Sequence, residues 1–440
     1  MRRRPLTYLL VAALALAAPA AAQTPLTLTD AIARARARNP DAGSAAAVER
    51  EAAQRVRQAR AGYLPKVDVV ESWQRGNQPV FVFSSLLAQR QFTAADFALG
   101  ALNHPEPLDN FRTSVMVEQS LFDGATRATV AAAGIGQDVA AATRVMVDHD
   151  LAASVTIVYG RVLVAVAANQ SAAAAAETAR GDRELSGNRR DAGLVTDADV
   201  LQLDVHMSRT RAQQIRATSD ERIARAQLNQ LMGEPLGEAF ALDPSLGAPA
   251  IETTDLASLE AEALGNRPEV KLAALQERLA TATQAAARAA FLPQVSAQGG
   301  WEFNGGTWPA RTSSWVVGAV ARVNLFRGFA DSAHLVEARE QAARRGLERE
   351  KAETAARLDV YVAVARVEAA RASETVGRAA VEQAHESRRI VRDRYEAGLT
   401  DVASLLRAAE AVVQAETQQT AARVAVLTET AALERTLGRR

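Results

Sequence analysis

The feature that most constrains this 440-residue sequence is an internal duplication. The stretch AGYLPKVDVVESW begins at Ala61, and AAFLPQVSAQGGW begins at Ala289 with the same Leu-Pro pair, valine and tryptophan at matching positions. A proline pushes the residue before it into extended geometry. We therefore expect a helix to end at Pro65 and again at Pro293, with a strand following each proline.

The N-terminal segment has the pattern of an export signal. Three arginines precede a short apolar run, and Ala20 and Ala22 flank a cleavage point before Gln23, as is typical of a cleaved secretory signal. The alternative is an uncleaved anchor, but the apolar run is shorter than the ~20 residues of a spanning helix. We expect residues 1–22 to be removed. The sequence contains no cysteine, so neither a lipid on an N-terminal cysteine nor a disulfide scaffold is expected.

Composition narrows the classes of protein further. The chain carries 51 basic and 51 acidic residues, so it lacks the basic patch that nucleic-acid binding requires. Aromatic residues make up only 5% while alanine is abundant, which suits long, closely packed helices better than a compact globular core. No apolar run beyond the N-terminal segment reaches the length of a spanning helix, and the closest is VTIVYGRVLVAVAA, which begins at Val155.

After each proline the hydrophobic pattern changes to a period of two. In the segment 294–304, Val295, Trp301 and Phe303 share one strand face, whereas polar residues occupy the other. Such a strand fits between lipid and a wet lumen. A half-buried strand of a soluble sheet has the same pattern, so both interpretations stay open at this point.

The two halves differ by an insertion. The motif SLFDG, which begins at Ser120, aligns with NLFRG, which begins at Asn324. These two motifs are separated by fewer residues than the two Leu-Pro motifs are. The extra residues of the first half lie near 79–105 and include several phenylalanines. We expect an elaborated hairpin loop, which either lies over an outer mouth or packs on neighbouring subunits.

A long helix follows each strand pair, at about 124–191 and 329–396. At 1.5 Å per residue, about 66 residues form a helix of roughly 100 Å. A heptad stripe predicts the packing face of the second long helix. Its positions are Leu358, Val362, Ala365, Ala369, Ala372, Val376 and Ala379.

Each long helix ends in an Ala-Gly-Leu turn. Gly193 and Gly398 suit the left-handed position of a helix C-cap, and Thr196 and Thr400 can cap the helix that returns. The predicted boundaries are a first repeat at 23–232 (strands about 66–76 and 110–122, tip hairpin 192–196, return helix 197–232), a linker at 233–255, and a second repeat at 256–440 (strands about 294–304 and 313–326, tip hairpin 397–400, return helix 401–437).

Each repeat contributes two strands, so one chain supplies four. Four strands cannot close a membrane barrel, whose smallest examples have about eight, and open strand edges cannot face lipid. Closure therefore requires other copies of the chain. Three copies would supply twelve strands.

The duplicated order of helix, two strands, long helix, glycine hairpin and return helix resembles the TolC-type outer-membrane efflux protein family. The LTLTDAI opening at Leu26, the two Leu-Pro transitions, the LF.G motifs and the glycine hairpins carry this resemblance. It implies a mainly α-helical fold with β-barrel strands. The family forms a trimer, with a 12-stranded β-barrel in the outer membrane of a Gram-negative bacterium continued by a periplasmic α-helical barrel.

The resemblance also implies function and partners. The chain would be a passive exit duct of a tripartite efflux pump or a type I secretion system. Its partners would be a periplasmic adaptor (membrane fusion) protein and an inner-membrane RND or ABC transporter, and the sequence identifies neither the transporter nor the cargo.

Site residues are transferred by position from the same resemblance. Tyr395 matches a gating tyrosine and Asp199 its hydrogen-bonding aspartate. Ser404 and Arg407 stand where some members carry a cation-binding ring of aspartates, so such a ring is not expected. The adaptor-docking tips are Gly193, Leu194, Thr196, Gly398, Leu399 and Thr400. The tryptophans expected at the barrel–membrane interface are Trp73, Trp301 and Trp315.

Two other classes of protein compete with the channel. An enzyme is disfavoured because the five histidines are scattered without metal-ligand spacing and no catalytic motif occurs, so no metal or cofactor is expected. A periplasmic coiled-coil scaffold without a pore would explain the helices. It would have no use for four alternating strands with interface tryptophans.

Overall fold

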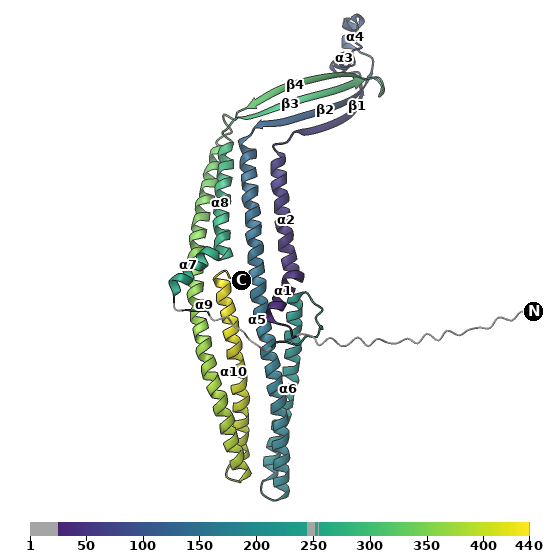
Figure 1. The fold of residues 1–440 in the computed structure, drawn as a ribbon. Coiled ribbons are helices and arrows are strands. Elements are labelled where there is room, and N and C mark those ends of the chain that lie inside the picture. Colours follow the sequence, from purple (N-terminus) through teal and green to yellow (C-terminus); the bar gives the residue numbers. More distant parts are fainter. Residues whose placement is uncertain (1–24, 244–250, 254, 440) are drawn as a thin grey trace, which may run out of the picture. The chain divides into compact units, whose positions relative to one another are not determined.

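The computed structural model describes residues 25–243, 251–253 and 255–439 (Figure 1). The predicted signal segment 1–22 and part of the predicted linker 233–255 lie outside the described residues. The chain divides into two compact units, each of which we describe by itself. One contains the residues up to Asn39 with Leu151–Ile251 and Ala365–Ala432, and the other contains Pro40–Asp150, Glu252–Val364 and the residues from Leu433 onward.

The elements confirm two repeats of the same order. The first repeat contains α1 (Leu28–Arg38), α2 (Pro40–Ala61), β1 (Lys66–Gly76), α3 (Pro79–Ala88), the 3-10 helix η1 (Ala94–Phe97), α4 (Leu99–Asn103), β2 (Leu108–Phe122), α5 (Gly124–Asp191) and α6 (Asp197–Met232). The second contains α7 (Leu256–Asn266), α8 (Pro268–Ala289), β3 (Gln294–Gly305), β4 (Thr312–Arg322), α9 (Ala330–Glu396) and α10 (Val402–Thr436). Both Leu-Pro motifs lie between a helix and a strand, as expected.

The four strands form one antiparallel sheet in the order β1-β2-β3-β4. Its register places Val69 opposite Val115, Val115 opposite Trp301, and Trp301 opposite Trp315. An apolar row therefore crosses all four strands on one face, with Val69, Trp301 and Trp315 exposed and Val115 half-buried. The other face carries polar residues, including an ion pair between Arg112 and Glu302. The alternation predicted from the sequence is thus present in all four strands, with exceptions on the polar face at Val70, Met116 and Val316, which are exposed.

The last strand is shorter than predicted. β4 ends at Arg322 rather than at residue 326. Its partner strand β3 begins at Gln294, which is opposite Arg322, and the preceding Pro293 has no N–H to donate. Asn324 instead hydrogen-bonds the carboxylate of Asp331 at the start of α9, so the chain leaves the sheet early.

The insertion between β1 and β2 elaborates the connection of this strand pair, as predicted, and it does so with helices. It forms α3, η1 and α4. Phe92 packs edge-on against Phe83 and Phe97, with ring centroids 4.9 and 5.0 Å apart. Thr93 and Asp96 form a capping box at the start of η1. The phenylalanines predicted to mark a loop therefore pack against one another in a folded insert, in which Phe97 stays largely exposed.

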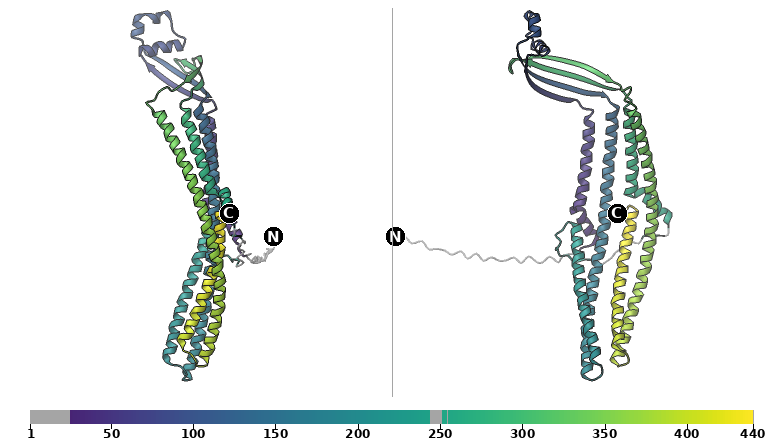
Figure 2. Two further views of the ribbon diagram at one scale, coloured as in Figure 1. Left: turned by 90° about the vertical axis from the view of Figure 1, so that its left-hand side faces the viewer. Right: turned by 180° about the vertical axis from the view of Figure 1, so that it is seen from behind.

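The long helices pair with their return helices as antiparallel hairpins. α6 returns along α5 and α10 returns along α9 (Figure 2). The heptad stripe predicted for α9 is wrong, since Leu358 and Val376 are exposed. The buried positions are displaced by two residues along the helix and comprise Ala356, Val360, Ala363, Val367 and Ala370. Alanine and valine recur on both stripes, so hydrophobicity alone does not distinguish them.

One long helix contains an unexpectedly apolar stretch. Among the described helices, only α5 has an 18-residue window long and apolar enough to cross a membrane. Within it, Val155, Tyr159 and Val162 are buried against other parts of the protein. Helix packing accounts for these buried positions.

Tyr159 ties the N-terminal segment to the chain that follows α6. Its hydroxyl lies 2.9 Å from the carbonyl oxygen of Leu26 and 3.0 Å from that of Asp243. Burial raises the pKa of Tyr159 to about 12, so the hydroxyl keeps the proton that these bonds require. A parallel bridge between Leu26 and Leu242 completes the junction.

Gly233 ends α6 where no side chain fits. Its φ of 68° is left-handed, and a Cβ there would lie 2.8 Å from the carbonyl oxygen of Arg38. We expect Gly233→Ala to destabilise the fold by more than the ~1–2 kcal/mol of a left-handed non-glycine residue, because the backbone clash adds to it. Thermal unfolding followed by circular dichroism measures the loss. Gly237→Ala is the control, since a Cβ there meets nothing within 4 Å, and equal unfolding temperatures for both variants would contradict the argument.

Candidate functional site

The two helical hairpins end in the same backbone turn. The N–H of Gly193 donates to the carbonyl of Arg190, and that of Leu194 to the carbonyl of Arg189. Gly398 and Leu399 repeat both bonds at the end of α9. This pair of hydrogen bonds is a Schellman C-cap, which requires a left-handed residue. The φ angles of Gly193 and Gly398 are 74° and 75°, in agreement with the sequence.

The return helices are capped at one fixed distance from the glycine. Thr196 caps α6 and forms a capping box with Asp199. In the second hairpin the predicted cap Thr400 is wrong, because Asp401 accepts a hydrogen bond from the N–H of Ser404 at 2.9 Å. Thr196 and Asp401 each follow the glycine by the same number of residues. The Schellman turn fixes this spacing. The cap therefore lies at the same position in both hairpins, whether or not a threonine occupies it.

Each tip presents one exposed leucine. Leu194 is 66% exposed and Leu399 is 69% exposed, at matching positions directly after the glycine. An exposed apolar side chain on a short polar turn offers a contact for another protein. The structure thus places the predicted tip residues on a pair of matching turns.

Tyr395 and Asp199 have different partners from those predicted. Tyr395 is buried with Leu203, Val402 and Leu405, and its hydroxyl donates to Ser186 Oγ at 3.3 Å. The carboxylate of Asp199 instead accepts from the backbone N–H and the hydroxyl of Thr196 at 2.9 and 2.8 Å. Asp199 is thus engaged in capping the first turn of α6, and Tyr395 forms its hydrogen bond with Ser186 of α5 instead.

Arg189 is the tip residue that sequence reasoning missed. Its guanidinium lies over the ring of Tyr395, 5.3 Å from the centroid, and donates to the carbonyl of Glu396 at 2.6 Å. A residue of α5 thereby holds the last turn of α9. The only signal in the sequence is a basic residue in the last turn of a helix. Such a residue interacts favourably with the helix dipole, but it does not indicate a contact with the other hairpin.

An ionic cluster surrounds the buried carboxylate of Asp182 between the hairpins. Burial raises the pKa of Asp182 on α5, and Arg388 and Arg392 of α9 oppose that shift. His206 of α6 is also near this carboxylate, and burial lowers its pKa. A cavity of about 520 Å³ lined by His206, Arg388 and Glu410 adjoins the cluster. Among the described residues, no group of three or more histidines and carboxylates is arranged to hold a metal ion.

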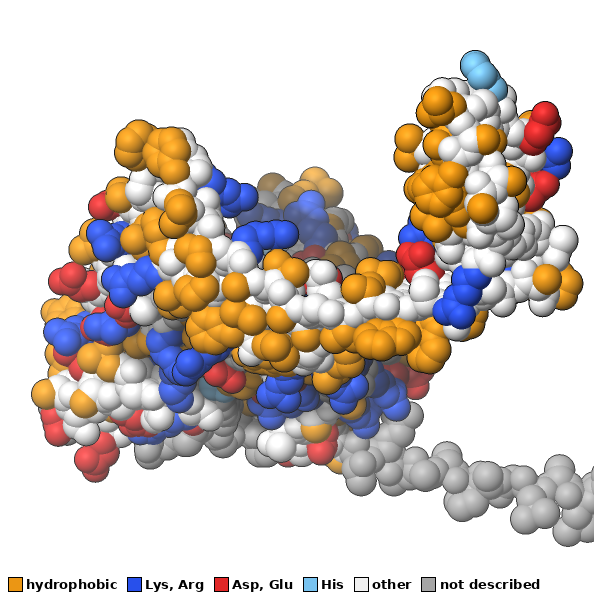
Figure 3. Space-filling model, turned by 90° about the horizontal axis from the view of Figure 1, so that it is seen from above, with side chains coloured by type: hydrophobic (Ala, Val, Ile, Leu, Met, Phe, Trp, Pro, Cys, Tyr) orange, Lys and Arg blue, Asp and Glu red, His pale blue; other side chains and the backbone are white. Residues whose placement is uncertain are grey.

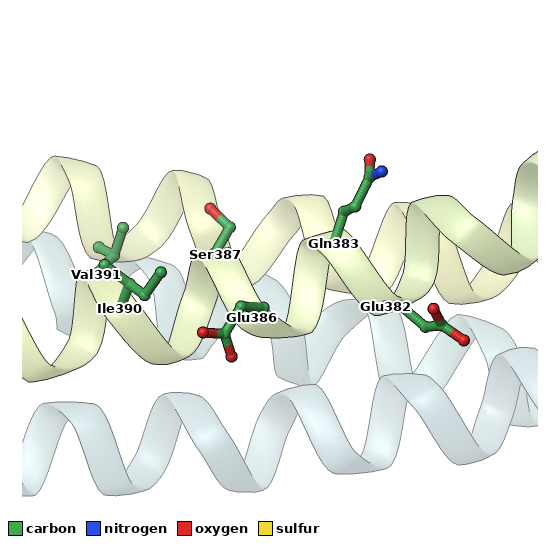
Figure 4. Close-up of a pocket in the computed structure, with 6 residues that line it drawn as sticks. All are labelled: Glu382, Gln383, Glu386, Ser387, Ile390 and Val391. Carbon is green, nitrogen blue, oxygen red and sulfur yellow. The ribbon is translucent and has the colours of Figure 1, made fainter.

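A depression on α9 does not form an enclosed binding site. Figure 4 shows that its lining residues all project from this one helix, with Glu382 and Glu386 on one side and Gln383 and Ser387 on the other. Side chains that diverge from a single helix cannot surround a small molecule. This part of α9 is an open surface.

The three predicted interface tryptophans lie on the apolar face of the sheet. Trp73 donates to Asp109 Oδ1 at 3.1 Å, Trp301 stacks on Phe303, and Trp315 is exposed. A ring that is exposed on its apolar body and bonded through its N–H suits a boundary between lipid and water.

Comparison with known proteins covers most of the chain. A family model described as outer membrane efflux protein matches residues 31–234 and 259–439. Protein CyaE of Bordetella pertussis is 31% identical over 309 residues, which are 68% of this chain and 65% of that protein. The match thus spans slightly less than two thirds of the relative.

Solved structures of this fold align along nearly the whole chain. The CmeC outer membrane channel of Campylobacter jejuni has a TM-score of 0.79 at 16% identity, covering 93% of this chain and 85% of its own. The outer membrane protein VceC of Vibrio cholerae has a TM-score of 0.77 at 18% identity, covering 93% and 96%. The predicted fold, with strand pairs between long helices, is thereby confirmed.

The contacts of Arg189 predict a measurable link between the hairpins. Arg189→Ala removes the hydrogen bond to Glu396 and the contact with the Tyr395 ring, which together stabilise by about 1–2 kcal/mol. We expect faster amide hydrogen exchange in the last turn of α9. Arg190→Ala is the matched control, because Arg190 pairs with Asp191 of its own hairpin. Equal exchange in both variants would show that Arg189 does not join the hairpins.

The raised pKa of Asp182 predicts that the stability of the fold depends on pH. Because its pKa in the folded protein is raised above 3.8, its contribution to stability is complete below that value and is lost as pH rises through the folded pKa. Asp182→Asn should therefore flatten the pH profile of thermal stability in this window and raise stability at neutral pH. Asp220→Asn, exposed on α6, controls for loss of one charge. A destabilised Asp182→Asn variant at neutral pH would contradict the sign.

Proposed function

The chain belongs to the outer membrane efflux protein family, and on this premise we propose that three copies form a passive duct from the periplasm through the outer membrane. Family membership places the chain in the outer membrane and among transport proteins rather than enzymes, as the sequence predicts. The proposal adds the trimer, the conducting state and the partners.

The observation that carries the proposal is the open sheet. In the described part of the chain, β1 and β4 are the outer strands and each has one neighbour. Backbone groups of an open edge cost several kcal/mol each in lipid. The exposed apolar face, with Val69, Trp301 and Trp315, is the face that lipid would cover. Pairing β4 of one copy with β1 of the next removes every edge, and three copies give twelve strands.

The tips are the proposed docking surface for a periplasmic adaptor. Leu194 and Leu399 provide two similar apolar contacts per chain, so a trimer would present six around one axis. The adaptor would connect the duct to an inner-membrane transporter of the RND type, for drug efflux, or of the ABC type, for type I secretion. Copurification of the assembled complex identifies which transporter is bound.

We place the gate at the contact between the hairpins. Ser186 and Arg189 on α5 hold Tyr395 on α9, and widening of the duct at this level would require these contacts to break. Asp199 stabilises the neighbouring turn through Thr196 and has no direct part in this contact.

The apolar face of the sheet argues against the alternative of a periplasmic scaffold. A periplasmic scaffold would expose the apolar row of Val69, Val115, Trp301 and Trp315 to water, where a contiguous patch of this kind promotes aggregation. A membrane barrel gives the same row a lipid environment.

Docking and membrane assembly can be separated at Gly398. Gly398→Glu places a charged residue at a φ of 75°, which costs about 1–2 kcal/mol and distorts the tip far along the sequence from the strands. We expect trimers that resist detergent until heated and that conduct in planar bilayers, yet fail to restore drug resistance or protein secretion to a deletion strain.

Gly43→Glu is the matched control, since Gly43 is exposed on α2 with open space around its Cα. It should retain both assembly and export. Normal export by the Gly398 variant would refute the docking assignment, and monomers without conductance from the wild-type protein would refute the duct itself.

A further inference from the structure

The insert between β1 and β2 is anchored to the polar face of the sheet. The side chain of Gln89 is buried, and its Nε2 donates to the carbonyl of Asp109 at 2.9 Å and to Asn110 Oδ1 at 3.1 Å. Asn110 in turn donates to Asn304 Oδ1 at 3.0 Å. Asn110 is two residues before Arg112, so these amides project from the same face as the ion pair between Arg112 and Glu302.

Two further bonds fix the insert to the start of β4. Thr312 Oγ1 donates to the carbonyl of Ala88 at 2.8 Å, and Arg90 donates to the carbonyl of Ser313 at 3.0 Å. The end of α3 is therefore bonded to β2 and β4, and through Asn110 to β3. With this many bonds, the insert is a fixed part of the sheet end rather than a loose loop.

The insert nevertheless exposes large apolar side chains. Val80 is 82% exposed, Phe97 is 66% exposed and Leu99 is 77% exposed. Figure 3 shows hydrophobic side chains gathered on the insert where it projects from the end of the sheet, apart from those along the sheet itself. An apolar surface on a rigid, water-facing element indicates a contact that one chain does not complete.

We propose that this surface is covered by the same insert of the neighbouring copies, so that three inserts meet and narrow the outer mouth of the barrel. The inference rests on the proposed trimeric duct. In a closed barrel the apolar face turns outward to lipid and the polar face turns toward the axis. An insert fixed to the polar face therefore projects over the lumen, where a threefold axis brings identical surfaces together.

Lipid is the other apolar environment near a barrel, and the anchoring argues against it. Val317 and Trp315 lie on the opposite face of the sheet from Asn110 and Asn304. An insert that covered lipid-facing surface would be bonded to that face. Its bonds to Asn110, and through it to Asn304, turn the insert away from the bilayer.

The absence of cysteine from the sequence allows a direct test. Leu99→Cys and Val80→Cys each introduce a single thiol on the exposed surface of the insert. Val317→Cys, 73% exposed on the apolar face of β4, is the matched control. Membranes that contain each variant are treated with a short bismaleimide, and the proteins are then fully denatured and separated by electrophoresis.

We expect cross-linked dimers from at least one insert variant and only monomers from Val317→Cys. Monomers from both insert variants, in samples that remain trimeric and conducting when not denatured, would overturn the inference and leave the duct intact. Quenching of a bimane label on Cys variants of the insert by brominated lipid would also overturn it, in favour of a lipid contact. Loss of the trimer in the wild-type sample would refute the proposed duct, and the inference with it.

Discussion

The backbone of a strand cannot leave its N–H and C=O groups unpaired in lipid, and this constraint governs the whole molecule. The chain has four strands in one sheet, and β1 and β4 each lack a second neighbour among the described strands. A single copy in a bilayer would expose two rows of unpaired groups. In the proposed trimer, membrane insertion and association would therefore be coupled for this sheet, and the helices would have to place three sheets so that their edges meet.

Local physics made the boundaries of the repeats predictable. A proline acts on its immediate neighbours, so Pro65 and Pro293 mark the start of strands without any knowledge of the tertiary structure. The glycines at 193 and 398 act in the same local way, because only a left-handed residue closes the turn. The alternating pattern of 294–304 is equally local. These features gave the order of the elements and the positions of both tips.

Contacts between distant parts of the chain were not predictable in the same way. Alanine occupies several stripes of α9, so the packing face depends on neighbours that one helix does not specify. Thr400 was assigned as a cap by residue type, whereas the backbone of the turn selects Asp401 by distance. Tyr395 bonds Ser186, a residue that the family pattern does not mark. The insert had no counterpart in the second half, so the duplication gave no information about its helices.

The two hairpins share one backbone but differ in the side chain at the cap. The first is capped by the hydroxyl of Thr196, which donates in turn to the carboxylate of Asp199 one turn further along α6. The second is capped by Asp401, whose pKa is lowered by hydrogen bonds from Ser404, which keep the carboxylate charged. A ring built from three chains would thus have sixfold shape and only threefold chemistry. On such a ring, the hairpin of the proposed adaptor could enter any of six similar positions by shape. The cap carboxylate belongs to Asp199 in one tip and to Asp401 in the other, at different positions of the turn. Neighbouring positions would therefore be unequal, and the divergence of two turns that began as copies would set the register of the adaptor.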